Sequence, residues 1–320
     1  MKQDDLGLNL TSCKTRTGKF LDEMERVVQW AQLLAQIEPH APRKERGRPL
    51  FDAEVMLCIH FLPQWFGLSD LAVEGALFNV PLYRQFAGLS GMNRLPDRVS
   101  ILRFRQLLDQ HELAPKTLKV VNATLAGKGL MLKESTAVDA SLIASPRSTK
   151  NNSGTRGLEM HPTRKGNQWY FGMKCHIGVD GDSGLVHTVV GASASINDVT
   201  QVHALVHGAE AGEFADAGCQ GVGKRDNNQD THARWHIALR PGPHRLLGTT
   251  DRKEAIADQM EHVKARIRAK AEHPFRVIKR QFDHVKVRYR GRAKNTVPLH
   301  TLFAQSNLWM ARRQLMAAQG

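Results

Sequence analysis

Three acidic residues that lie far apart in the sequence are suited to metal-dependent chemistry. Asp139 lies in a segment of alternating apolar and polar residues, Asp216 ends a second such segment, and Glu272 lies in a late helical segment. Phosphodiester cleavage needs carboxylates that hold two Mg²⁺ ions about 3.5–4 Å apart, one activating the attacking oxygen and one stabilising the leaving oxygen. Because Mg²⁺ and Mn²⁺ prefer oxygen ligands, we expect these three residues to be catalytic and to bind two such ions.

The third acid lies between two cations at helical spacing. Arg268, Glu272 and Lys279 fall within roughly 60° of one another on a helix, so one face would carry an acid between two phosphate-binding cations. Pro274 interrupts this pattern, because proline lacks a backbone N–H and disfavours helix at the preceding residue. Two arrangements follow: a helix that kinks at Pro274, or a new helix that begins there and leaves Glu272 at its edge.

The segments that must position these acids follow a strand-rich order. Alternating apolar residues predict five strands, over residues 135–145, 169–179, 185–190, 212–217 and 235–239. A mobile basic loop is expected from Pro146 to Asn167, and a helix capped by Asn197 is expected between the third and fourth strands. An antiparallel start continued by parallel strands packed with helices is the plan of the ribonuclease-H-like α/β fold, a mixed sheet flanked by helices. Asp139 and Asp216 would then end neighbouring strands.

The composition favours a polyanionic partner in a reducing compartment. Lys and Arg number 45 against 31 for Asp and Glu, a formal net charge of +14, which attracts nucleic acid. The four cysteines form no C-x-x-C pair, so neither a disulfide framework nor a zinc knuckle is indicated. The sequence has no signal-peptide pattern and no apolar stretch of roughly 20 residues. We therefore expect a cytoplasmic protein with double-stranded DNA, and no membrane, as its partner.

Apolar spacing predicts a helical N-terminal part and sets the domain boundaries. One amphipathic helix is expected between Phe20 and Ala35, and residues 51–125 are predicted to be all helical, with one helix opened by Pro96-Asp97. After Lys133 the period changes from helical to alternating. We expect three regions: a tail and helix over 1–49, a helical DNA-binding or dimerisation domain over 50–133, and the ribonuclease-H-like catalytic domain over 134–320.

Several basic residues are candidates for contacts with DNA phosphates. Besides Arg268 and Lys279, the candidates are Arg276, Arg280, Lys174, His176, Arg103 and Arg105. For the last four, hydration on a strand or helix face is an equal alternative. The basic run from Lys286 to Lys294 contains few acids, which favours binding to DNA that weakens steeply with salt.

At these residues the chain resembles the DDE transposases of bacterial insertion sequences, specifically the group named for insertion sequence five. The resemblance extends from about Phe51 to Met316. It is densest over residues 60–69, 101–105, 165–174 and 271–282.

The family signature consists of Tyr, two residues, Arg, three residues, Glu, six residues and Lys. Arg268, Glu272 and Lys279 match it, whereas Ala265 occupies the tyrosine position. In the segment that resembles the second-aspartate motif, Cys219 stands where tyrosine is usual. The resemblance leaves the three acids intact as metal ligands.

The carboxylates and the resemblance together predict a transposase. It would cleave DNA at mobile-element ends with metal-activated water and then use the freed 3′-hydroxyl to attack target DNA, without a covalent enzyme intermediate. We expect a homodimer that binds terminal repeats and target DNA. Two alternatives stay open: a ribonuclease-H-like nuclease without strand transfer, and a catalytically inactive, transposase-derived DNA-binding protein, which Ala265 and Cys219 motivate.

Overall fold

Helices form the N-terminal part of the structure, a computed structural model that describes residues 14–42, 50–89, 91, 94–146, 159–225, 233–247 and 251–318. They are α1 (Arg16–Val27), α2 (Trp30–Ile37), a short 3₁₀ helix (Glu38–His40), α3 (Ala53–Trp65), α4 (Asp70–Asn79), α5 (Pro81–Phe86), α6 (Arg98–Gln110) and α7 (Leu113–Gly127). The all-helical prediction for 51–125 is therefore confirmed over the described residues. Residues 1–13 and 43–49 of the predicted tail region lie outside them.

Local signals explain where these helices begin and end. Asp97 caps α6 as predicted, because its side chain accepts a hydrogen bond of 2.7 Å from the backbone N–H of Ser100. The single helix predicted between Phe20 and Ala35 is wrong, since α1 ends at Val27 and α2 starts at Trp30. Val28 has an extended backbone (φ −73°, ψ 131°), which redirects the chain.

The rest of the chain forms a mixed sheet. Its strands are β1 (Ser135–Ala144), β2 (His161–Lys165), β3 (Gln168–Asp180), β4 (Val186–Ser193), β5 (Gly212–Ala215) and β6 (Arg234–Ile237). The described strands form a six-stranded sheet of order β2-β3-β1-β5-β6, with β4 also paired to β3. Strand β3 is antiparallel to β1, β2 and β4, whereas β5 is parallel to both β1 and β6. All five predicted strands are confirmed, with ends shifted by a few residues.

Strand β2 was not predicted, because it falls within the segment expected to be a loop. Its residues, His161 to Lys165, are polar and mostly exposed, so they lack the alternation that marks a strand. The strand is held by antiparallel pairing with β3. Residues 147–158 of the expected loop lie outside the described residues.

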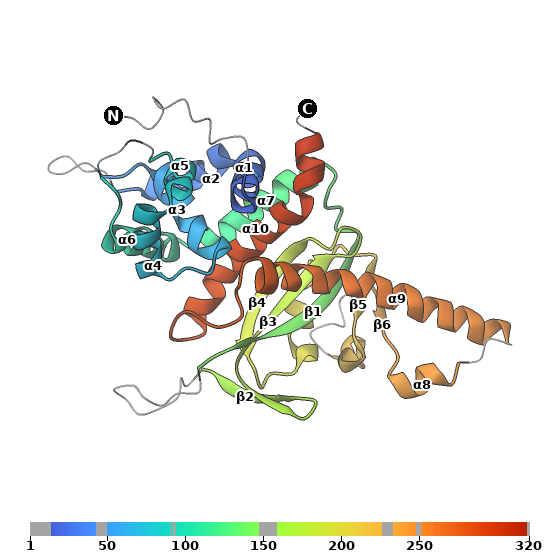
Figure 1. Ribbon diagram of the computed structural model, residues 1–320. Helices are drawn as coiled ribbons and strands as arrows, with labels where there is room; N and C mark the ends of the chain where they lie inside the picture. The colour runs from blue at the N-terminus through green and yellow to red at the C-terminus, as the bar shows by residue number, and fades with distance from the viewer. Residues whose placement is uncertain are drawn as a thin grey trace.

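Long helices cover one face of the sheet. Helix α9 (Arg252–Arg276), a π-helical turn (Val277–Gln281) and α10 (Ala293–Ala317) follow the short helix α8 (Pro241–Arg245). Figure 1 shows α9 passing across the sheet and continuing beyond it towards α8. Alternate residues of β1 serve two cores: Ala137 and Ile143 belong to the larger core with α9 and α10, and Val138 belongs to a smaller core.

The smaller core corrects the prediction of an α-helix after Asn197. Two 3₁₀ helices, Asp198–Thr200 and Val202–Ala204, occupy this segment instead. Residues three apart align on a 3₁₀ helix, so this conformation lets Val202 and Leu205, each 1 % exposed, pack together against Val138.

The helical N-terminal part and the sheet share the larger core. That core extends from Phe20 in α1 to Leu315 in α10 without a break between the two parts. Within the described residues, no single helix has the length and hydropathy of a membrane span, although α3 and α4 pass that test as a pair bent by 109°.

A buried amide network links α7, β4 and α10. Asn307 Nδ2 donates to Asn122 Oδ1 at 2.8 Å and to Val186 O at 2.7 Å, and Asn307 Oδ1 accepts from Val186 N at 2.8 Å. Asn122 Nδ2 also donates to Val186 O at 3.0 Å. These contacts satisfy the backbone at the start of β4, which is otherwise enclosed by the core.

We predict that Asn307→Ala destabilises the protein, because it leaves the backbone N–H of Val186 buried without a partner. The free energy of unfolding should fall by about 2–4 kcal/mol, measured by urea denaturation. The matched control is Arg313→Ala on the exposed side of the same helix, for which a change within about 0.5 kcal/mol is expected. Equal effects of the two substitutions would contradict this role of the network.

Candidate active site

The three acids singled out by the sequence line one cavity of about 810 Å³. Asp139 comes from β1, Asp216 directly follows β5, and Glu272 lies on α9. Cations from four elements line the same cavity, namely Arg164, Lys165, Lys174, Arg268 and Lys279. Segments more than a hundred residues apart thus meet at a single polar site.

Parallel pairing explains why the two aspartates are neighbours. Ala137 of β1 is in register with Phe214 of β5, and each aspartate lies two residues further along its chain. Asp216 caps a short 3₁₀ helix, because its Oδ1 accepts a hydrogen bond of 3.0 Å from Gly218 N. The sheet therefore holds both aspartates side by side on adjacent strands. Asp216 follows the end of β5 as predicted, whereas the expectation that Asp139 ends its strand is wrong, because β1 continues to Ala144 through its pairing with β3.

Asp139 is the most confined of the three acids. Burial, followed by repulsion from Glu272 and Asp216, raises the pKa of Asp139 to about 6. The backbone N–H of Ala140, which donates to its Oδ1 at 2.8 Å, and the charge of Arg268 oppose this rise. The carboxylates are thus close enough to repel one another, and the arrangement favours a positive charge among them.

Helix α9 brings the third acid to the cavity. It continues through Pro274 to Arg276, so no new helix begins at the proline as one of the two predicted arrangements required. The helix then widens into the π-helical turn. This turn places Lys279 so that its Nζ donates to Ser141 Oγ at 2.6 Å and to Leu142 O at 2.9 Å, both on β1. Glu272 itself is exposed.

The donor set suits a hard divalent cation, because three carboxylates line the cavity and repel one another at Asp139. The described residues nevertheless contain no group of three or more His, Cys, Asp or Glu side chains already arranged as a metal site. The carboxylates therefore share a cavity without forming a closed ligand cluster.

The other predicted DNA-binding residues have different surroundings. Lys174 lines the cavity, whereas Arg276 and Arg280 are exposed next to it in sequence but do not line it. His176 is only 1 % exposed, and burial lowers its pKa to about 4. The expectation of His176 on an open strand face is wrong, because the 3₁₀ segment after β4 covers that face and supplies Asp198, 3.8 Å from His176 Nδ1.

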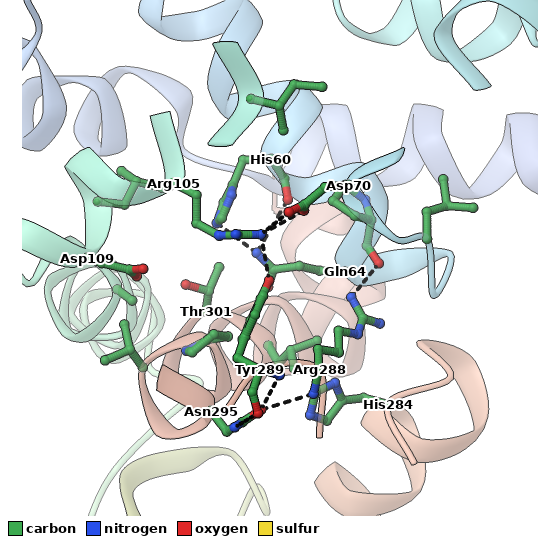
Figure 2. Close-up of a pocket in the computed structure, with 18 residues that line it drawn as sticks. His60, Gln64, Asp70, Arg105, Asp109, His284, Arg288, Tyr289, Asn295 and Thr301 are labelled. Atoms are coloured by element: carbon green, nitrogen blue, oxygen red, sulfur yellow. Dashed lines mark hydrogen bonds and ion pairs between the residues drawn. The ribbon is translucent and has the colours of Figure 1, made fainter. Parts of the chain in front are cut away.

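Arg105 lines a separate small cavity between α6 and the segment before α10 (Figure 2). Its Nη1 donates to Asp70 at 2.6 Å and to Tyr289 Oη at 3.0 Å. Arg288, from the predicted basic stripe, lines the same cavity and donates to Pro63 O at 3.0 Å. Both guanidinium groups therefore join the helical part to the chain after α9. Sequence reasoning had assigned both arginines to the surface.

Arg103 remains on the surface of α6. It is exposed and lines an apolar pocket of about 300 Å³ with Phe51 and Phe104. Arg94, which also lines this pocket, stacks on Phe51 with 4.1 Å between its guanidinium carbon and the ring centroid.

Sequence reasoning missed several residues of the main cavity, among them an acid and a tyrosine. Asp198 and Tyr170 both line it. An acid in the segment after a predicted strand was the available signal for Asp198, but that segment was assigned to an ordinary capped helix.

Two family models match this chain. One, described as "Transposase DDE domain", matches residues 131–308, more than half of the chain. The other, described as "Transposase domain (DUF772)", matches residues 9–107. The first match spans all three acids and the second covers most of the N-terminal helices. No solved structure matches the chain significantly.

We predict that Asp139→Asn stabilises the metal-free protein at neutral pH. A carboxyl group whose folded-state pKa is raised, here from 3.8 to about 6, favours folding fully below pH 3.8, and this contribution is lost as the pH rises through 6. The variant should exceed the wild type by on the order of 1–2 kcal/mol at pH 7.5 and match it near pH 4. Urea denaturation in EDTA measures both values.

Asp182→Asn, at an exposed position on the turn between β3 and β4, is the control and should give no pH-dependent gain. The prediction fails if Asp139→Asn is less stable than the wild type at pH 7.5, or if the difference between them is the same at both pH values.

Proposed function

This chain belongs to the transposase DDE domain family, and from that premise we propose that it cuts DNA at the ends of a bacterial insertion sequence and joins the freed 3′ ends to target DNA. We further propose that it belongs to the insertion-sequence-five group. The observation that carries the proposal is the shared cavity of Asp139, Asp216 and Glu272.

The strand order supports a ribonuclease-H-like catalytic core over residues 134–320. With β2 left out, the order across the sheet is β4-β3-β1-β5-β6. Strand β3 is antiparallel to both of its neighbours, β4 and β1, and β5 and β6 run parallel to β1. This matches the plan expected from the sequence. The helices before Lys133 would form the DNA-binding or dimerisation part, although they share the larger core with the sheet.

Asp139, Asp216 and Glu272 would hold two Mg²⁺ or Mn²⁺ ions. Bound there, such ions would supply activation of the attacking oxygen and stabilisation of the leaving oxygen. The sheet orients Asp139 and Asp216 in advance through the hydrogen bonds from Ala140 N and Gly218 N. Preorganised carboxylates need little rearrangement when substrate binds.

The cations of the cavity would bind the DNA backbone beside the scissile phosphate. Arg268 and Lys279 lie on either side of Glu272 in sequence, and Lys165 and Lys174 approach from β2 and β3. Burial, with repulsion from Lys165, lowers the pKa of Lys279, and a phosphate would offset that repulsion. DNA affinity should therefore depend strongly on salt.

The two departures from the family pattern do not remove these groups. Cys219 is 3 % exposed and packs in the smaller core with Val138 and Ala215, so it fills an apolar site. Ala265 is exposed on α9, one turn before Arg268. We propose an active enzyme, and the inactive DNA-binding protein remains the alternative that these two residues motivate.

Two element ends must be held together for strand transfer, so we propose that the chain acts as a homodimer on DNA. The net charge of +14 suits a partner as highly charged as two DNA duplexes.

Replacing any of the three acids by its amide should abolish cleavage while sparing DNA binding. For Asp139→Asn, Asp216→Asn and Glu272→Gln we expect Mg²⁺-dependent nicking of flanking genomic DNA to fall at least about a hundredfold to a thousandfold, measured on labelled duplexes. Glu134→Gln, an exposed acid just before β1, should cleave like the wild type. Undiminished Mg²⁺-dependent cutting in all three variants would falsify the assignment.

A precut element end with a free 3′-hydroxyl should be joined to a supercoiled plasmid. This follows because the proposed site uses that hydroxyl as its second nucleophile, and gel electrophoresis detects the joined product. A protein that nicks intact ends but never joins precut ones is the nuclease alternative, and one that binds ends without nicking them is the inactive alternative.

A further inference from the structure

Asp198 is a fourth acid of the main cavity. It begins the 3₁₀ helix that follows β4, and its side chain is 42 % exposed. It lines the main cavity together with Asp139, Asp216 and Glu272. The sequence signature does not include it, so its role must be argued from its contacts.

Its closest charged partner is Lys174. Lys174 Nζ donates to Asp198 Oδ1 at 2.9 Å and to the backbone oxygen of Ile196 at 2.8 Å. An ammonium group carries three N–H donors, so these two contacts among the described residues leave a third donor for another acceptor. Lys174 is 19 % exposed and lines the main cavity, so that donor can serve a group bound there.

The other neighbour of Asp198 is an uncharged imidazole. His176 Nδ1 lies 3.8 Å from Asp198 Oδ1, and burial lowers the pKa of His176 to about 4 against the attraction of Asp198. His176 and Asp198 line a second cavity, of about 20 Å³, with Asp139 and Asp216. His176 Nε2 is buried and has no hydrogen-bond partner in the described part of the chain. Of these two neighbours, Lys174 balances the charge of Asp198 and His176 does not.

These two hydrogen bonds can favour phosphate binding, because the lysine side chain is long and flexible. Fixing its side chain costs rotamer entropy, which a bound phosphate would otherwise have to offset. Two acceptors on the loop after β4 hold the ammonium before DNA arrives.

We propose that Asp198 is a positioning residue that holds Lys174 so that its third N–H contacts a DNA phosphate in the main cavity. This inference rests on the proposed function, because the phosphate it invokes belongs to the DNA substrate. Asp198 acts through Lys174, so its effect on DNA should vanish when Lys174 is absent.

The sign of the effect separates this role from simple electrostatics. Removing an acid from a DNA-binding cavity reduces repulsion and should strengthen binding if the acid holds nothing in place. The positioning role requires the opposite result. Asp198→Asn should weaken binding although it removes one negative charge from the protein.

The experiment measures binding of a fluorescent duplex of flanking genomic DNA, in EDTA, over a range of salt concentrations. Wild type is compared with Asp198→Asn, Lys174→Gln and the double variant. Asp182→Asn is the matched control, since it removes an exposed acid elsewhere on the surface. Thermal unfolding of each variant identifies loss of structure.

We expect Asp198→Asn and Lys174→Gln each to weaken binding on the order of fivefold and to lower the salt slope by about one phosphate contact. The double variant should match Lys174→Gln. The inference is overturned if Asp198→Asn binds DNA as well as or better than the wild type, if its salt slope is unchanged, or if the two substitutions add independently.

A cleavage assay on the same duplex separates this inference from the proposed function. Wild-type protein that binds but never cleaves with Mg²⁺ or Mn²⁺ would contradict the proposed activity, while the binding comparison would still decide the role of Asp198. Wild-type cleavage with unaltered binding by Asp198→Asn would contradict only the positioning role.

Discussion

Burial of Asp139 beside two other carboxylates is the constraint on which the rest of this structure depends. Burial and the charges of Glu272 and Asp216 raise the pKa of Asp139 to about 6, so the site opposes folding at neutral pH. The parallel pairing of β1 with β5 and the packing of α9 in the larger core hold the acids in place against that repulsion. A site that costs stability must be supported by a rigid frame.

The frame was largely predictable because it follows periodic patterns. The apolar row of β3, from Phe171 to Val179, is buried in the larger core as its alternation required. Strand β5 and its parallel pairing were also predicted, and the pairing of β5 with β1 brings Asp139 and Asp216 together. Helical spacing likewise put Arg268, Glu272 and Lys279 on the same cavity.

The rest could not be predicted because it depends on which surfaces the fold covers. His176 lies opposite the apolar row of β3, and only the packing of the 3₁₀ segment buries it. The sequence predicted Arg105 on an outward helix face, but in the fold the chain after α9 places Tyr289 against it. Strand β2 consists mostly of polar residues and is held by its pairing with β3. Asp198 is paired because the fold brings it to Lys174 of β3.

Titration of Mn²⁺ into the purified protein, followed by electron paramagnetic resonance of the free ion, tests the central claim most directly. The account predicts that the wild type removes two equivalents of Mn²⁺ from solution when DNA is bound. Asp139→Asn, Asp216→Asn and Glu272→Gln should each lose at least one of these equivalents. Equal stoichiometry and affinity in the wild type and all three variants would contradict the claim that these carboxylates share bound cations.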